Sequence, residues 1–173
     1  MGKSKRGIDA FWLKIMAIAG MTLDHAGIVF GQFIPLWAET LLYAFGGLTF
    51  PIMAFLLCEG YRYTRNVKKY ALRLLGFALL TQLPYMWALY NQLNVLFTLL
   101  LGLLALYSMD KVQQPAARIL IVAGLVVVSF FCDWGIIGVP MVLLYYKLEN
   151  RWMRTAVPIL LPVIFMGLNA IQG

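Results

Sequence analysis

Residues 11–31 read FWLKIMAIAGMTLDHAGIVFG, and this stretch decides the class of fold. Lys14, Asp24 and His25 are its only ionisable residues. A helix needs about 20 mostly apolar residues to cross a bilayer core of about 30 Å, so the stretch predicts a transmembrane helix. It is too long for the apolar segment of a signal peptide, and no A-x-A-like cleavage site follows it. We therefore interpret it as a retained first membrane helix.

The apolar character extends through all 173 residues, of which 62% are hydrophobic and 12% charged. Soluble domains carry about 25% charged residues, because they must cover their surface with polar groups. Lipid removes that requirement. The composition therefore predicts a single integral membrane domain over residues 1–173 and argues against a soluble enzyme.

Seven apolar stretches are candidates for membrane spans. They cover residues 11–31, 40–61, 70–90, 93–109, 116–131, 135–147 and 155–171. Prolines within them should kink the helices, because proline lacks an N–H donor and its ring clashes with the preceding turn. These prolines are Pro51, Pro84, Pro140, Pro158 and Pro162. The predicted fold is an all-α polytopic bundle of seven transmembrane helices.

The basic residues test this assignment. All 14 Lys and Arg fall in the N-terminal segment up to Lys14 or in the second-to-third, fourth-to-fifth and sixth-to-seventh connections. The positive-inside rule places that side in the cytoplasm, with the N-terminus. We expect a multi-pass protein of the bacterial inner membrane whose net charge of +7 reflects topology and lipid contact, with no nucleic acid as partner.

Metal and disulfide chemistry are not expected. One histidine and two separated cysteines cannot build a usual zinc site. Cys58 and Cys132 fall at opposite membrane faces of the predicted bundle, too far apart for a disulfide.

Asp24 and His25 are ionisable residues within a predicted span, where such groups are costly and usually face the bundle interior. A neutral imidazole can act as a general base, and a carboxylate can orient it. The alternative is an interhelical hydrogen bond with a purely structural role. Lys14 lies eleven residues before His25, on nearly the same helix face and about 16 Å away. That stripe suits an elongated ligand with an anionic head. The alternative is that Lys14 only extends to the cytoplasmic lipid headgroups.

Two further polar sets are candidates for a site. Near the cytoplasm, Arg62, Arg65 and Arg73 belong to a cationic patch that suits phosphate groups or anionic lipid, and Glu59 can form an ion pair with Arg62 one turn away. At the outer side, Asn94 and Thr98 are four residues apart, and Asp133 lies in a tight turn. Each of these could line a site or serve the local structure alone.

Four separated stretches resemble those of the TraX family of membrane proteins. They are Leu23-Asp24-His25-Ala26-Gly27, residues 50–65 (FPIMAFLLCEGYRYTR), residues 94–102 (NVLFTLLLG) and Asp133-Trp134-Gly135. The family is named for the enzyme that acetylates the N-terminal amine of F-type pilin. It also resembles membrane acyltransferases that carry Arg-x10-His and Arg-x-x-Arg motifs, to which Lys14 and His25, and Arg62 and Arg65, are similar.

The resemblance implies an acetyltransferase. Cytoplasmic acetyl-CoA would be the co-substrate, with its phosphates near Lys14, Arg62, Arg65 and Arg73 and with Glu59 beside them. His25 would be the base, oriented by Asp24 or Asp133, and Asn94 or Thr98 would donate to the oxyanion. The acceptor would be an amine or hydroxyl, on a pilin-like peptide or a glycan. A small transporter or proton carrier and a non-catalytic assembly factor are the alternatives.

Overall fold

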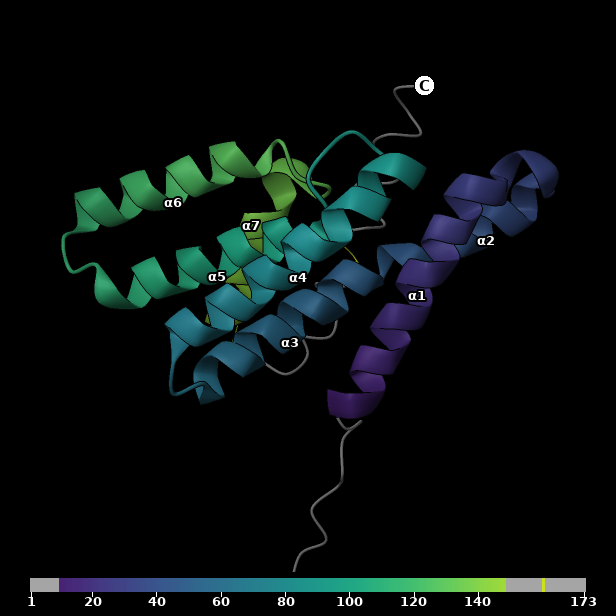
Figure 1. Cartoon of the computed structure of the whole chain (residues 1–173). Coiled ribbons are helices and arrows are strands. Elements are labelled where there is room, and N and C mark those ends of the chain that lie inside the picture. Colours follow the sequence, from purple (N-terminus) through teal and green to yellow (C-terminus); the bar gives the residue numbers. More distant parts are fainter. Residues whose placement is uncertain (1–9, 149–159, 161–173) are drawn as a thin grey trace, which may run out of the picture. The chain divides into compact units, whose positions relative to one another are not determined.

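The computed structural model describes residues 10–148 and Leu160, and within them it is helical (Figure 1). The helices are α1 (Ala10–Phe30), α2 (Leu36–Gly47), α3 (Thr49–Tyr63), α4 (Val67–Ala88), α5 (Val95–Lys111), α6 (Pro115–Ser129) and α7 (Gly135–Lys147), with a short 3₁₀ helix, η1 (Gly31–Phe33), after α1. The all-α prediction is thus confirmed for the described residues. The seventh predicted span, 155–171, lies outside them except for Leu160.

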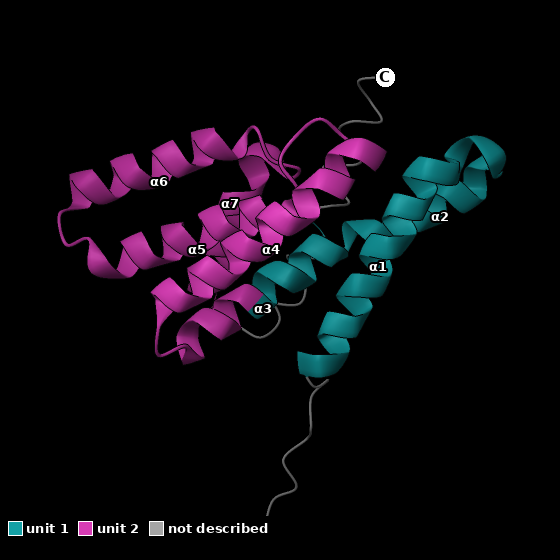
Figure 2. Ribbon diagram, in the orientation of Figure 1, with its two compact units in different colours: residues 1–56, 158–173 teal, residues 57–157 magenta. Residues whose placement is uncertain are grey.

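The chain falls into two compact units, coloured separately in Figure 2. Of the described residues, 10–56 and Leu160 belong to the first unit and 57–148 to the second. The boundary falls within α3, between Leu56 and Leu57. That residues 1–173 form a single membrane domain stays a prediction.

In the first unit, α1 packs closely on α2 and on the start of α3 because the contact face of α1 carries small residues. Ala17, Gly20 and Gly27 are its buried positions. A Cβ atom added to Gly20 would lie 2.7 Å from the Thr49 hydroxyl and 3.0 Å from the Phe45 carbonyl oxygen. The Thr49 hydroxyl also donates a hydrogen bond of 3.3 Å to the Ala17 carbonyl. Small residues of this kind let helix backbones approach, as they do in membrane bundles.

The predicted second span, 40–61, is two helices and not one. α2 ends at Gly47 and α3 begins at Thr49, so the chain breaks at Leu48. Pro51 explains the position of the break, since in a continuous helix its ring would clash with the Gly47 carbonyl four residues earlier. It lies instead in the first turn of α3, where its missing N–H has no intrahelical partner to lose. The interruption at Leu48, three residues before Pro51, agrees with the proline kink predicted there.

In the second unit, α5 is the central helix and packs on α4, α6 and α7. Its buried face includes Leu99, Leu103 and Leu106, which are at most 2% exposed. Gly102 brings α5 close to α7, because an added Cβ atom would lie 2.8 Å from a methyl of Val142. α3 joins this core through the Cys58 thiol, which donates to the Val142 carbonyl at 3.3 Å. Both Cys58 and Cys132 are buried, and neither forms a disulfide.

The remaining predicted spans correspond to single helices with ends shifted by at most three residues. Spans 70–90, 93–109 and 116–131 are α4, α5 and α6, and span 135–147 is α7 with identical bounds. Pro84 and Pro140 lie within α4 and α7, as expected.

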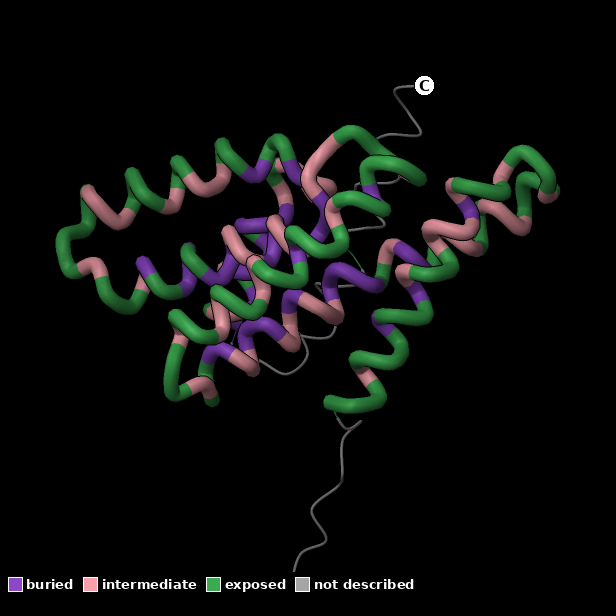
Figure 3. Tube along the Cα trace, viewed as in Figure 1, coloured by how far each residue is buried: buried purple, intermediate pink, exposed green. Residues whose placement is uncertain are grey.

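Many large apolar residues are exposed. Figure 3 shows that exposed residues make up much of α1 and α6. Leu83 and Trp87 on α4 are 77% and 92% exposed, and Leu120 on α6 is 75% exposed. Two segments, Ala10–Phe33 and Leu36–Tyr63, are long and apolar enough to cross a membrane, with mean hydropathies of 1.4 and 2.0.

Candidate functional site

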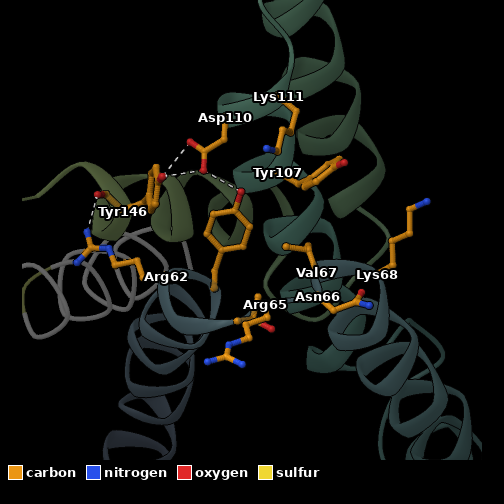
Figure 4. Close-up of a pocket in the computed structure, with 11 residues that line it drawn as sticks. Arg62, Arg65, Asn66, Val67, Lys68, Tyr107, Asp110, Lys111 and Tyr146 are labelled. Carbon is orange, nitrogen blue, oxygen red and sulfur yellow. Dashed lines mark hydrogen bonds between the residues drawn. The ribbon is translucent and has the colours of Figure 1, made fainter.

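A pocket of about 560 Å³ opens in the second unit, where α3, α5 and α7 end and α4 begins (Figure 4). Its lining combines cationic side chains, tyrosines and one carboxylate. The lining residues are Tyr61, Arg62, Thr64, Arg65, Asn66, Val67, Lys68, Tyr107, Asp110, Lys111 and Tyr146. Two of the arginines predicted to bind a phosphorylated ligand, Arg62 and Arg65, are among them.

Asp110, on the last turn of α5, accepts hydrogen bonds from two tyrosines (Figure 4). The Tyr61 hydroxyl of α3 donates to Oδ2 at 2.8 Å. The Tyr146 hydroxyl of α7 donates to Oδ1 and Oδ2, at 2.8 and 2.9 Å. The two rings also pack edge to face, with centroids 5.9 Å apart. This carboxylate therefore links three helices at the rim of the pocket.

Arg62 is held in place by three contacts. Its guanidinium pairs with the Glu59 carboxylate at 3.1 Å, which is the i,i+3 ion pair that the sequence predicted. A second N–H donates to the Tyr146 carbonyl at 3.0 Å. The guanidinium also lies over the Tyr146 ring, 5.6 Å from its centroid, within the range of a cation–π contact. Arg62 is thus preorganised as a wall of the pocket.

The other three cations of the pocket have no anionic partner among the described residues. Within the described part of the chain, Arg65, Lys68 and Lys111 make no side-chain hydrogen bond or ion pair. The first turn of α4 adds backbone N–H groups, and the Asn66 side chain caps it by accepting from the Lys69 amide at 2.9 Å. Free cations beside a helix N-terminus favour an anion, because both supply positive potential.

Two other predicted donor-site residues lie apart from the pocket lining. Arg73 is exposed on α4, and Glu59 contacts the pocket only through Arg62. Their assignment to a donor site remains a prediction.

Lys14, Asp24 and His25 lie on α1 in the first unit. Lys14 is exposed, while Asp24 and His25 are partly buried. The Asp24 carboxylate packs directly on the backbone of Gly46, since a Cβ atom there would overlap Asp24. The structure thus places this acid in the α1–α2 interface, with His25 as its neighbour on the chain.

Asn94 has a structural role. It is the N-cap of α5, and its side-chain oxygen accepts from the Leu96 amide at 3.0 Å. Its side-chain nitrogen donates to the Ala78 carbonyl at 2.9 Å and to the Thr81 hydroxyl at 3.2 Å, both on α4. These contacts occupy the amide that was predicted to donate to an oxyanion, and that catalytic role remains a prediction.

Asp133 lies in the turn between α6 and α7, which is bonded to the segment before α5. Its amide donates to the Leu93 carbonyl at 2.8 Å, and the Leu93 amide donates to the Phe131 carbonyl at 3.0 Å. The Asp133 carboxylate lies beside the Tyr85 hydroxyl of α4. Thr98, fully buried on α5, contacts the Cys132 thiol. Asp133, Asn94 and Thr98 therefore lie at the end of the second unit where α5 begins, and the pocket lies where α5 ends.

Sequence reasoning missed Asp110, Lys111 and the two tyrosines, although one signal was present. Asp110 is an acidic residue at the end of an apolar span and directly precedes a lysine, in a connection on the predicted cytoplasmic side. Its tyrosine partners come from stretches 36 and 49 residues away in the chain, and no local pattern joins them to it.

These features define a class of helical protein that has apolar segments of membrane length and a cationic pocket where helices end. A family model described as TraX protein matches residues 10–172, and the chain belongs to the TraX family. The probable fimbrial assembly protein FimC, serogroup H1, of Dichelobacter nodosus is 37% identical over 166 residues. That alignment covers 84% of this chain and 66% of the relative, so the chain spans slightly less than two thirds of the relative's length. No solved structure matches.

Proposed function

We propose that the chain is a multi-pass membrane acetyltransferase. It moves an acetyl group from cytoplasmic acetyl-CoA to an amine or hydroxyl acceptor at the outer side of the bacterial inner membrane. The observation that carries the proposal is the pocket that gathers Arg62 and Arg65 with Lys68 and Lys111. The family membership of residues 10–172 supports it.

The membrane assignment rests on the surface and on the length of the helices. Large apolar side chains such as Leu83, Trp87 and Leu120 would be unfavourable in water at this exposure, and lipid removes that cost. Two segments have the length and hydropathy of a span. Shorter helices such as α6 and α7 would cross the bilayer with their ends in the membrane–water interface. A helix bundle tolerates this difference between the hydrophobic length of a helix and the thickness of the bilayer.

The pocket suits the phosphorylated part of the donor in charge and size. Its volume of about 560 Å³ falls within the range of small-molecule sites, roughly 300–1,000 Å³. Lysine and arginine bind phosphate through charge-assisted hydrogen bonds. On the predicted topology, Lys68 and Lys111 lie on the cytoplasmic side, where acetyl-CoA is available.

In the proposed reaction, the acceptor nitrogen or oxygen attacks the thioester carbonyl while His25 takes its proton. The tetrahedral intermediate then collapses, the carbon–sulfur bond breaks, and coenzyme A leaves as the thiol after it gains a proton. Asp24 would keep the imidazole in the required tautomer. This assignment rests on the position of both side chains in one partly buried turn of α1.

The acceptor proposal draws on the relative's name. A protein named for fimbrial assembly favours a pilin-like peptide, whose N-terminal amine would accept the acetyl group, over a glycan.

The test uses purified protein, labelled acetyl-CoA and a panel of peptide and glycan acceptors. We expect transfer by the wild type and at least a hundredfold loss in His25→Ala, because general base catalysis contributes about 10²–10⁴-fold. Thr22→Ala is the matched control, since Thr22 is exposed on α1 and bonds only to its own helix in the described residues. Unchanged transfer by folded His25→Ala would remove His25 from the mechanism.

The relative's name also favours a second candidate, a non-catalytic fimbrial assembly factor. This candidate predicts that cells with His25→Ala or Asp24→Asn still assemble fimbriae at the wild-type level. Counting surface fimbriae by electron microscopy, with protein amounts matched, separates the two functions.

A further inference from the structure

The pocket contains one carboxylate, Asp110, among four cationic side chains. A carboxylate in such a place would ordinarily pair with a neighbouring cation and cancel part of its charge. Within the described residues, Asp110 pairs with none of the four. The hydroxyls of Tyr61 and Tyr146 bind it instead, on the rim of the pocket.

These two tyrosines hold the carboxylate away from the cations. Tyr61 is 8% exposed, so its hydroxyl position is fixed by packing. Tyr146 is fixed from its other side by Arg62, which lies over its ring and bonds to its carbonyl. Figure 4 shows Asp110 turned toward Tyr146, with Lys111 extending separately from the same helix end. Lys111, Arg65 and Lys68 therefore remain available to an anion.

Asp110 also keeps hydrogen-bonding capacity of its own. A carboxylate offers about four acceptor positions, and here only two hydroxyl groups donate to it. Its residue is exposed at the pocket, so a ligand N–H or O–H could use the remaining capacity. An anion without N–H or O–H groups, such as sulfate, has no such donor and would only be repelled by the negative charge.

We propose that Asp110 is the specificity-determining residue of this pocket. It selects a phosphorylated ligand that also has an amino or hydroxyl donor, as a nucleotide does, over an anion without a donor, such as sulfate. Selectivity arises as much from the repulsion of the wrong anion as from attraction to the right one. The identity of the ligand as coenzyme A rests on the proposed function, whereas the contrast between ligand classes rests on the pocket.

The experiment measures binding of coenzyme A and of sulfate to protein in nanodiscs of neutral phosphatidylcholine, by isothermal titration calorimetry. In Asp110→Asn we expect tighter sulfate binding and weaker coenzyme A binding. The preference for coenzyme A should fall by roughly tenfold or more, which is the effect of losing one charged hydrogen bond. If Asp110 had only a structural role, Asp110→Asn would weaken the binding of both ligands equally.

A second variant acts in the opposite direction. Tyr61→Phe/Tyr146→Phe keeps the carboxylate but releases it to pair with the cations, so we expect weaker sulfate binding. Adding Asp110→Asn to that double variant should restore sulfate binding, because the pocket lining then has no carboxylate to neutralise the cations. Such a thermodynamic cycle isolates the coupling between the carboxylate and its tyrosines.

The outcomes separate the two proposals. If the wild type prefers coenzyme A and Asp110→Asn keeps the same preference, the specificity role is overturned while the acetyltransferase proposal stands. If the wild type selects coenzyme A as described but transfers no acetyl group, only the proposed function fails. A wild type without preference overturns the specificity role directly. Displacement of coenzyme A by phosphatidylglycerol in the nanodisc would assign the pocket to a lipid headgroup. That outcome would overturn coenzyme A as the ligand, and with it the proposed function, while the specificity role stands.

Discussion

Asp24 shows how one small neighbour determines the place of a carboxylate. Its side chain packs on Gly46, which has no Cβ atom to exclude it. The acid is therefore partly buried between α1 and α2, where it would be shielded from lipid. The role proposed for Asp24 beside His25 depends on this packing, because the contact with Gly46 holds the carboxylate in place.

Gly46→Ala tests this contact. The added methyl would overlap the Asp24 carboxylate, so we expect a loss of about 1–3 kcal/mol of stability, which is typical of overpacking. Unfolding by SDS in mixed micelles measures the change.

Gly76→Ala is the matched control, because nothing lies within 4 Å of its added Cβ atom. Alanine within an exposed helix should be neutral or stabilise by up to about 1 kcal/mol. Equal effects of the two substitutions would contradict the close contact between Asp24 and Gly46.

The caps of α4 and α5 differ in how much structure they support. Asn66 caps α4 from an exposed position, with one bond to the Lys69 amide. Asn94 caps α5 from a buried position and also bonds to two groups of α4. Both are asparagines at an N-cap, and their sequence context does not distinguish them.

We therefore expect Asn94→Ala to destabilise the protein more than Asn66→Ala. The loss of a cap costs about 1 kcal/mol, and the two further bonds of Asn94 raise its cost to roughly 2–3 kcal/mol. The same SDS titration compares them. A cost for Asn66→Ala equal to or above that of Asn94→Ala would contradict the cross-link between α4 and α5.

The helices themselves were largely predictable, because an apolar run between polar turns defines a helix of membrane length whatever it packs against. The bounds of α7 and the spans that became α4, α5 and α6 followed from that pattern alone. The apolar pattern did not predict the break at Leu48, because the neighbours of Leu48 are as apolar as those in a continuous helix. Gly46, Gly47 and Pro51 carried the signal, and their combined effect depends on the clash of one ring with one carbonyl.

The candidate site was predictable only in its local parts. Arg62 and Arg65 stand one turn apart, and Glu59 precedes Arg62 by another turn, so their association was visible in the sequence. Tyr61, Asp110 and Tyr146 come from three helices, and their meeting depends on the tertiary packing of the second unit. The selectivity proposed for Asp110 could not have been inferred without it.

For the chain as a whole, the proposed topology assigns successive loops to opposite sides of the membrane. Gln113 lies in the exposed loop between α5 and α6, and Asn91 in the exposed loop between α4 and α5. We expect Gln113→Cys to react with an impermeant maleimide only from the cytoplasmic side, and Asn91→Cys only from the outside. Mass-shift labelling of intact cells and inverted vesicles measures both.

The native protein is the control for that experiment, because Cys58 and Cys132 are buried and should label slowly. Reaction of both new cysteines from one side would show that α5 does not cross the membrane. Reaction of each from the side opposite to that expected would reverse the assigned orientation.

The close pairing of α1 and α2 has a consequence for biogenesis. Asp24 packs on the backbone of α2, and Glu39 of α2 packs against Gly31 at the end of the pair. A single helix with an unshielded carboxylate enters the bilayer at a cost of about 2.5–3.5 kcal/mol for a central acid. In the proposed membrane arrangement, pairing of the two helices would partly cover both acids, which are half-buried in this unit. The two helices should therefore leave the translocon together, as a preassembled hairpin, before α4 to α7 are synthesised.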